Sequence, residues 1–63
     1  MSGRWLIRDR LGLWLCNLPT TINDAQWSFS IVEARAFYRH EVEAVFAIIP
    51  SWYALTATEE RFP

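Results

Sequence analysis

A chain of 63 residues with one cysteine, Cys16, and one histidine, His40, has few means of holding a fold together. A single cysteine forms no disulfide within the chain, and one cysteine with one histidine is fewer than the four ligands of the usual zinc sites. A domain of this size buries only about 60% of the surface that its unfolded chain exposes. We therefore expect one domain over residues 1–63 that is stabilised by dense apolar packing, self-association or a partner, with no metal and no cofactor.

The composition favours dense packing over disorder. Hydrophobic residues make up 52% of the chain and aromatic residues 16%, which excludes a disordered tail. Six arginines face seven aspartates and glutamates, and lysine is absent. This balance argues against direct nucleic-acid binding through a basic stripe. Because Asp9 and Arg10 interrupt the N-terminal apolar stretch, no apolar run reaches the roughly 18 residues of a membrane span, and we expect a cytoplasmic protein.

Three segments have the alternating pattern of half-buried strands. Residues 4–9 alternate large apolar and polar side chains, residues 9–12 have the Asp and Gly of a tight turn, and residues 13–18 form the return strand. Residues 26–30 predict a short strand or an extended lead-in to a helix, and residues 51–60 alternate again as a last strand.

The stretch between these strands predicts the helical part of the chain. Ser30 and Glu33 have the spacing of a capping box, and residues 34–49 contain neither glycine nor proline. Apolar residues follow three- and four-residue steps, which gives the segment one apolar face. We expect a first helix over residues 30–36 and a second over 39–49, separate or continuous, with Pro50 as the stop.

Together these elements predict an α+β domain in the order β-β-(β)-α-β. A small antiparallel sheet of three to four strands carries one helix, continuous or broken into two, on one face. The residues expected in the core between them are Trp5, Ile7, Trp27, Phe29, Phe37, Val42, Val45, Phe46, Ile49, Tyr53 and Leu55.

The stretch "YRHEVEA", residues 38–44, is the place to look for catalytic chemistry, because it contains His40. In the helical zinc-protease motif a second histidine follows four residues later, and here that position is Ala44. Glu41 or Glu43 could orient His40 as a base, or His40 could pair with Cys16, but no spacing indicates such a site. We therefore expect no enzyme, and a solvated polar stripe formed by Arg35, Arg39, His40 and Glu43.

Four tryptophans, four phenylalanines and two tyrosines are more rings than one helix-covered sheet face is expected to bury. The remaining face is predicted to contain Trp14, Trp52, Arg4, Arg8 and Leu6. Tryptophan and arginine dominate binding hot spots, so this face predicts a partner-binding surface or a homodimer contact. Alternatively, different strand registers would let the rings cover the edges of the core. Stacking on unpaired bases is a third possibility, although acidic residues offset the nearby arginines.

The pattern of "QWSFSIVEARAFYRHEVEAVFAIIPSWYALTATEE" is similar to that of short phage and prophage proteins, some of which are anti-CRISPRs. The shared features are a strand with tryptophan, Glu-Ala-Arg-x-Phe, a helix, a proline and a closing strand. The resemblance, over residues 27–63, implies a compact, non-catalytic inhibitor that occupies a surface of a host protein complex in the host cytosol, such as a CRISPR effector. The alternatives are an assembly module that homodimerises through the open sheet face and an accessory regulator that contacts nucleic acid.

Overall fold

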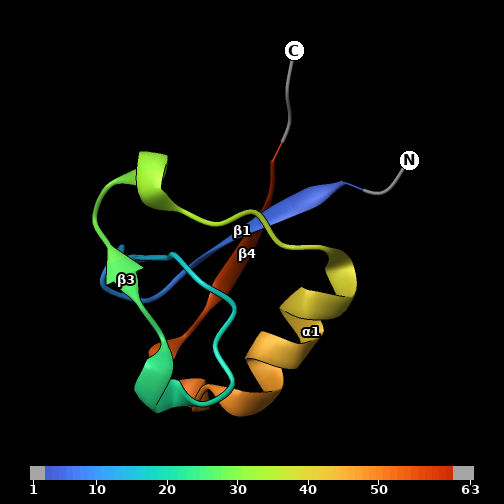
Figure 1. The fold of residues 1–63 in the computed structure, drawn as a ribbon. Coiled ribbons are helices and arrows are strands. Elements are labelled where there is room, and N and C mark those ends of the chain that lie inside the picture. Colours follow the sequence, from blue (N-terminus) through green and yellow to red (C-terminus); the bar gives the residue numbers. More distant parts are fainter. Residues whose placement is uncertain (1–2, 61–63) are drawn as a thin grey trace.

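In the computed structural model, which describes residues 3–60, four antiparallel strands form one sheet with an α-helix against one face (Figure 1). The spatial order of the strands is β3-β2-β1-β4. This architecture confirms the predicted α+β class. The elements in chain order are β1 (Arg4–Arg8), β2 (Trp14–Leu15), the 3-10 turn η1 (Ile22–Asp24), β3 (Trp27–Ser28), the 3-10 turn η2 (Ile31–Glu33), α1 (Arg39–Ile48), the 3-10 turn η3 (Ser51–Tyr53) and β4 (Thr56–Glu60).

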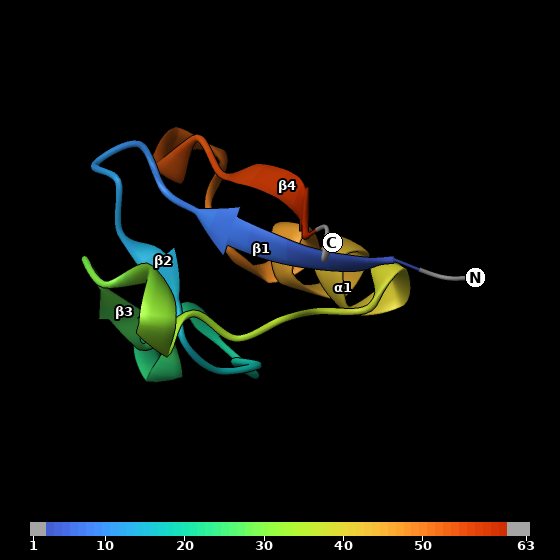
Figure 2. The same cartoon turned by 90° about the horizontal axis from the view of Figure 1, so that it is seen from above.

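Strand β1 lies in the middle of the sheet, between β2 and β4 (Figure 2). It pairs with β4 along its whole length, from Arg4 opposite Glu60 to Arg8 opposite Thr56. On its other edge β1 meets β2 only at Arg8. The rest of that edge is taken by the segment before α1, where Trp5 and Phe37 exchange two backbone hydrogen bonds of 2.8 Å. The return strand predicted over residues 13–18 is therefore only two residues long.

The predicted turn over residues 9–12 is confirmed. The buried carboxylate of Asp9 accepts the backbone N–H groups of Leu11 and Leu13, both at 2.9 Å, and the Asp9 carbonyl accepts the Gly12 N–H. Gly12 has a φ of 87°, a left-handed conformation that side chains with a Cβ rarely adopt. This tight connection requires two things: an aspartate that accepts the N–H groups of its own loop, and a glycine at positive φ.

The core lies between the sheet and α1. Buried side chains from β1, β2, the segment before α1, and α1 with its C-terminal cap meet there: Ile7, Leu15, Phe37, Val42, Val45 and Ile49. Trp5, Trp27, Tyr53 and Leu55 pack against this cluster while staying half-buried. Two expected members are wrong, because Phe29 is 78% exposed and Phe46 is 43% exposed. Phe29 lies beyond the end of β3, so the alternation of that strand no longer controls where its ring points.

The first predicted helix, over residues 30–36, is reduced to the single turn η2, so the helical region is not continuous. Ser30 makes no side-chain cap, and the Glu33 carboxylate instead accepts a hydrogen bond from the Ser28 hydroxyl. After η2 the chain is extended and pairs with β1 at Phe37. The helix α1 begins after Tyr38, whose backbone N–H is accepted by Glu41 at 2.9 Å, and it ends before Pro50 as expected.

The predicted last strand begins later than its alternation indicates. Residues 51–53 form the turn η3, and Ala54 follows in the left-handed region with a φ of 52°. Strand β4 starts only at Thr56, so Trp52 lies outside the sheet. The prediction that Trp52 lies on a sheet face is therefore wrong. The left-handed Ala54 resets the alternation, because it changes the direction of the chain between Trp52 and β4.

Candidate interaction surface

The five predicted site residues do not form one patch. Arg4, Leu6 and Arg8 alternate along β1 on the face turned away from α1, and Trp14 joins them because it pairs directly with Arg8. Leu6 is only 9% exposed, so the expectation of an uncovered apolar face is wrong at this residue. Trp52 is on η3, outside the sheet.

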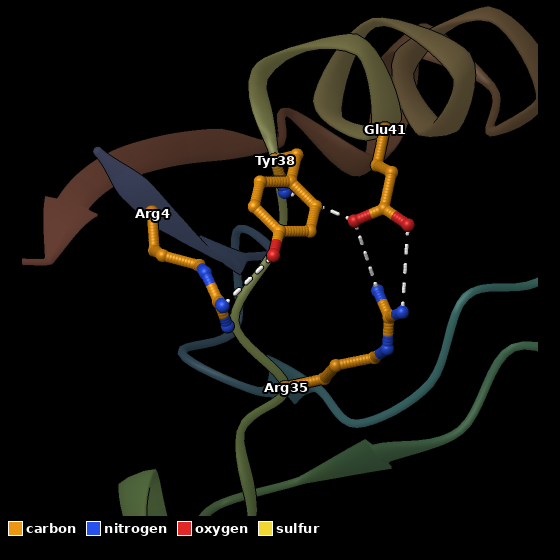
Figure 3. Close-up of polar contacts among 4 residues, drawn as sticks. All are labelled: Arg4, Arg35, Tyr38 and Glu41. Atoms are coloured by element: carbon orange, nitrogen blue, oxygen red, sulfur yellow. Dashed lines mark hydrogen bonds and ion pairs between the residues drawn. The ribbon is translucent and has the colours of Figure 1, made fainter. Parts of the chain in front are cut away.

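Arg4 is exposed at the start of β1, where its side chain contacts Tyr38 (Figure 3). Its guanidinium donates to the Tyr38 hydroxyl at 2.9 Å and lies 4.5 Å from the centre of the Tyr38 ring. This contact joins residues 34 positions apart in the chain, across the start of α1. Arg4 therefore ties β1 to the N-terminus of the helix.

The same helix start contains the polar network of Glu41 (Figure 3). The carboxylate accepts the Tyr38 backbone N–H and forms an ion pair with Arg35 at 3.3 Å. The Tyr38 hydrogen bond, with a smaller contribution from Arg35, holds the pKa of the Glu41 carboxyl below its usual value. This network fixes the helix start and, because both partners are engaged, it offers no free charge for chemistry.

Every arginine in residues 3–60 lies over an aromatic ring. The distances from guanidinium carbon to ring centre are between 4.5 and 5.6 Å, and the pairs are Arg4 with Tyr38, Arg8 with Trp14, Arg10 with Trp52, Arg35 with Phe37, and Arg39 with Trp5. Energetically significant contacts of this type occur about once per 70–80 residues in proteins. Much of the aromatic surplus therefore covers arginine side chains, a role for which the planar guanidinium is better suited than lysine.

Two of these pairs flank the β1–β2 turn. Arg8 stacks on Trp14 at 5.0 Å, and Arg10 stacks on Trp52 at 5.4 Å. A 2.9 Å hydrogen bond from the Arg10 N–H to the Tyr53 carbonyl joins the turn to η3. Leu11, in the turn, is 63% exposed, and Trp52 is 61% exposed. We call this group the turn-end surface, defined by Arg8, Arg10, Leu11, Trp14 and Trp52.

The Trp52 side chain is exposed, but neighbouring rings hold it in one position. Its ring packs on Tyr53 at 4.2 Å, and Tyr53 stacks on Trp27 of β3 at 5.8 Å. Tyr53 and Trp27 both pack against the core. The Trp52 ring is therefore held in place by a row of aromatic rings that reaches the core, so binding a partner would cost little side-chain entropy.

Sequence reasoning missed a second exposed surface, the apolar tip formed by Phe29, Ile31 and Val32. Ile31 and Val32 belong to η2, and Phe29 comes before it; the backbone of η2 lies far from α1 in both views (Figures 1 and 2). Val32 is the most exposed large apolar residue described, at 90%. The sequence "FSIV" does not by itself distinguish an exposed turn from the end of a buried strand and the start of a helix, which is why the pattern predicts a strand or lead-in up to residue 30 and a helix after it.

The residues considered for chemistry lie apart from these surfaces. His40 is exposed on α1, and its ring stacks on the Tyr38 ring at 5.9 Å. Arg39 and Glu43 of the predicted polar stripe are on the same helix, whereas Arg35 comes before the helix and does not belong to the stripe. Burial raises the pKa of the half-buried Cys16 thiol, and Glu33 raises it further. A high thiol pKa makes Cys16 a poor nucleophile at neutral pH.

Neither a metal site nor a membrane helix is present in the described part of the chain. No three histidine, cysteine, aspartate or glutamate side chains of residues 3–60 are grouped so that they could hold an ion. Within the same residues, α1 is too short and too polar to cross a membrane, and no other α-helix is described. Comparison with protein-family models, curated proteins and solved structures found no match for the chain.

Proposed function

We propose that the protein is a non-enzymatic binding protein that docks on a protein partner through the turn-end surface. The observation that supports this proposal is the exposure of Trp52, whose ring packs on Tyr53 and lies under the Arg10 guanidinium. Tryptophan and arginine are the residue types that contribute most to binding energy at protein interfaces. A small number of such anchors within about 800 Å² per partner is enough for tight binding.

The arrangement of charges also supports a protein partner over a nucleic acid. Arg8 and Arg10 are adjacent to Asp9, whose carboxylate is buried and engaged in the turn. Both arginines lie over tryptophan rings, so one face of each ring is already occupied and is not available for base stacking. A binder of single strands presents open aromatic faces along a basic groove.

In its more specific form, the proposal is a phage-type inhibitor that occupies a surface of a host assembly, such as a CRISPR effector complex. The support for this form is the resemblance of residues 27–63 to short phage and prophage proteins. An inhibitor of this type needs no chemistry of its own, because occupying the surface is enough to exclude DNA or a nuclease.

The test is a tagged pull-down from nuclease-treated lysate of the host bacterium, with mass spectrometry as the readout. We expect a stoichiometric host complex with the wild-type protein and at least a tenfold loss with Trp52→Ala, which corresponds to more than about 1.4 kcal/mol. The control is Val32→Ser, which removes an even more exposed apolar side chain from the apolar tip. Retention of the complex by Trp52→Ala and its loss in Val32→Ser would reassign binding to the tip.

Two further readouts complete the test. Both variants must keep the wild-type unfolding transition, because a melted Trp52→Ala protein would show that the ring is structural. Adding the purified protein to the captured effector and measuring target DNA cleavage then tests the inhibitor form. Unchanged cleavage at saturating protein would leave a binding protein without inhibitory activity.

A further inference from the structure

Two arginines of the turn-end surface have no acidic partner. The ion pairs within residues 3–60 lie at and just before the start of α1, where they use Arg35 and Arg39. Arg8 and Arg10 are both exposed, and their guanidinium groups form neither an ion pair nor a hydrogen bond within residues 3–60. Their contacts are with tryptophan rings, which leave the positive charge in place.

The one acidic side chain in the segments that form this end is turned into its own loop. Asp9 is only 8% exposed, and its Oδ1 atom accepts the Leu11 and Leu13 N–H groups. Residues 8–16 and 51–58 contain no other aspartate or glutamate. With two arginines and one aspartate, these segments have a net charge of +1. The rest of the chain, with four arginines and six acidic residues, has a net charge of −2.

The positive end is also distant from most of the acidic residues. The β1–β2 turn and η3 lie next to each other at one end of the sheet, and the start of α1 lies at the other (Figure 2). By the register of β1 and β4, Arg8 lies opposite Thr56, whereas the acidic end of β4 lies opposite Arg4. The molecule therefore has a positive end and a separate end where acidic side chains gather.

The two guanidinium groups retain their capacity to form hydrogen bonds. A guanidinium has five N–H donors in a planar fork, which fits a carboxylate through two parallel hydrogen bonds. Contact with a ring restricts the arginine side chain, so less entropy is lost when it binds. Apolar surface lies beside these donors, because Leu11 is 63% and Trp52 61% exposed. The surface therefore fits a ligand that carries carboxylates next to apolar side chains.

We propose that the turn-end surface binds an acidic segment of the partner protein, in which carboxylates flank one or two large apolar side chains. The carboxylates bind the Arg8 and Arg10 guanidinium groups, and the apolar side chains pack on Trp52 and Leu11. This inference rests on the proposed function, because it names the chemistry of the partner for the same surface. Complementary charge of this kind raises the association rate and excludes partners with a basic surface.

A second copy of the chain fits this surface less well than an acidic segment. In a two-fold dimer the same patch of each subunit faces its own copy. Two turn-end surfaces would bring together four exposed guanidinium groups, from Arg8 and Arg10 of each copy, and the one carboxylate of each copy, that of Asp9, is buried. Like charges placed against each other across an interface are unfavourable.

The first test is an NMR titration of the ¹⁵N-labelled protein with a capped synthetic peptide, Gly-Asp-Asp-Leu-Phe-Asp-Asp-Gly. We expect saturable shifts of the Trp52 indole N–H and the Arg10 amide, with affinity that falls as salt is added. The amides of the apolar tip stay unchanged. The control peptide has asparagine in place of each aspartate, and we expect it to bind about tenfold more weakly or worse. Equal affinity of the two peptides, or no saturable shift with the aspartate peptide, would overturn the inference.

Variants of the protein locate the charge that matters. The matched control is Arg39→Gln, because Arg39 is also exposed and lies over a ring, but it is paired with Glu43. We expect about a threefold loss of affinity for the aspartate peptide in Arg8→Gln or Arg10→Gln, about a tenfold loss in the double variant, and none in Arg39→Gln. Equal losses in all three single variants would show a general effect of charge and overturn the inference. If the double variant unfolds, the two peptides on the wild-type protein provide the test.

The host complex captured by the pull-down separates this inference from the function on which it rests. Loss of the complex in Trp52→Ala and in the double arginine variant, but not in Arg39→Gln, supports both. Loss in Trp52→Ala with full retention in the double arginine variant would keep the turn-end surface as the binding site and overturn the acidic partner. Retention in Trp52→Ala would overturn the proposed function, and the inference with it.

Two other ligands are distinguished with the same variants. Single-stranded oligothymidylate that shifts the Arg10 amide as strongly as the aspartate peptide would assign the arginines to phosphate binding and overturn the inference. A concentration-dependent dimer that the double arginine variant converts to monomer would assign the surface to a second copy, with the same consequence. We expect neither, so that the oligonucleotide leaves the Trp52 indole signal unchanged and the mass in solution is that of one chain.

Discussion

The β1–β4 half of the molecule and the β2–β3 half share one sheet, but different interactions hold them together. In the packed half, which comprises β1, β4, α1 and Phe37, five residue pairs join β1 to β4, and a helix with buried apolar side chains covers them. In the half that we call clamped, which comprises β2, β3 and the loop between them, only two residue pairs join the strands. Phe37 and Phe29 show the contrast, because one ring is fully buried and the other projects from the surface.

Leu15 of β2 is buried in the core, but the loop between β2 and β3 is held mainly by polar side chains. The Asp24 carboxylate accepts hydrogen bonds from the Thr20 and Thr21 backbone N–H groups and from the Thr20 hydroxyl. The Asn17 amide donates to the Asp24 carbonyl and accepts the Gln26 N–H, both at 2.9 Å. In a chain too short to bury every loop, side chains that satisfy the loop backbone hold its shape at the surface. The comparison therefore predicts two different sensitivities to mutation.

The largest expected effect is that of Phe37→Ala in the packed half. Removing a fully buried ring costs about 3–5 kcal/mol, which is comparable with the whole stability of a domain this small. The matched variant Phe29→Ala, in the clamped half, is expected to change the free energy of unfolding by less than about 0.5 kcal/mol. Chemical denaturation of the two variants measures the contrast. Similar losses would show that Phe29 packs in solution and that the two halves do not differ.

A smaller effect is expected for Asn17→Ala, which removes both side-chain hydrogen bonds of the loop. Each bond contributes about 0.5–1.5 kcal/mol net, so the loss of stability for the two is expected to be about 1–3 kcal/mol. Asn23→Ala is the control, because Asn23 is exposed on η1 and its side chain makes no hydrogen bond within residues 3–60. Faster hydrogen exchange at Gln26 in Asn17→Ala alone would confirm the local origin. Equal stability and equal Gln26 exchange in the two variants would show that the Asn17 hydrogen bonds do not stabilise the loop.

The smallest expected effect is a pH dependence that both halves share. The Thr21 N–H, followed by the Thr20 N–H and hydroxyl, lowers the pKa of Asp24, and the Tyr38 N–H lowers that of Glu41. A depressed folded pKa contributes stability above the unfolded carboxyl pKa, about 4, and this contribution is lost as pH falls through the folded value. Denaturation from neutral to acidic pH is expected to show a shallower acid loss in Asp24→Asn and in Glu41→Gln. If stability falls with pH as steeply in both variants as in the wild-type protein, Asp24 and Glu41 are not the source of the pH dependence.

Much of the fold follows from local pattern, whereas the candidate site follows from it only in part. The alternation of residues 4–9 predicted β1, and the apolar steps after residue 39 predicted α1 with its stop at Pro50. Of the predicted site residues, Arg8 and Trp14 do lie together, because they form a cross-strand pair next to a predictable turn. Leu6 lies on the predicted face but is buried, and Trp52 lies outside the sheet, because the exposure of Leu6 depends on what covers β1 and the place of Trp52 depends on the conformation of Ala54.

The sequence by itself determined the features that depend on neighbouring residues: the Asp9 turn with Gly12, the strand and helix periods, and the need for apolar packing without disulfides. Only the tertiary structure decided which rings are buried. Phe37 is in the core because its backbone pairs with Trp5, far away in the chain, and that pairing draws residues 34–38 out of a helix. Such a choice depends on the edge that β1 leaves open beside a short β2, and no local pattern encodes that edge.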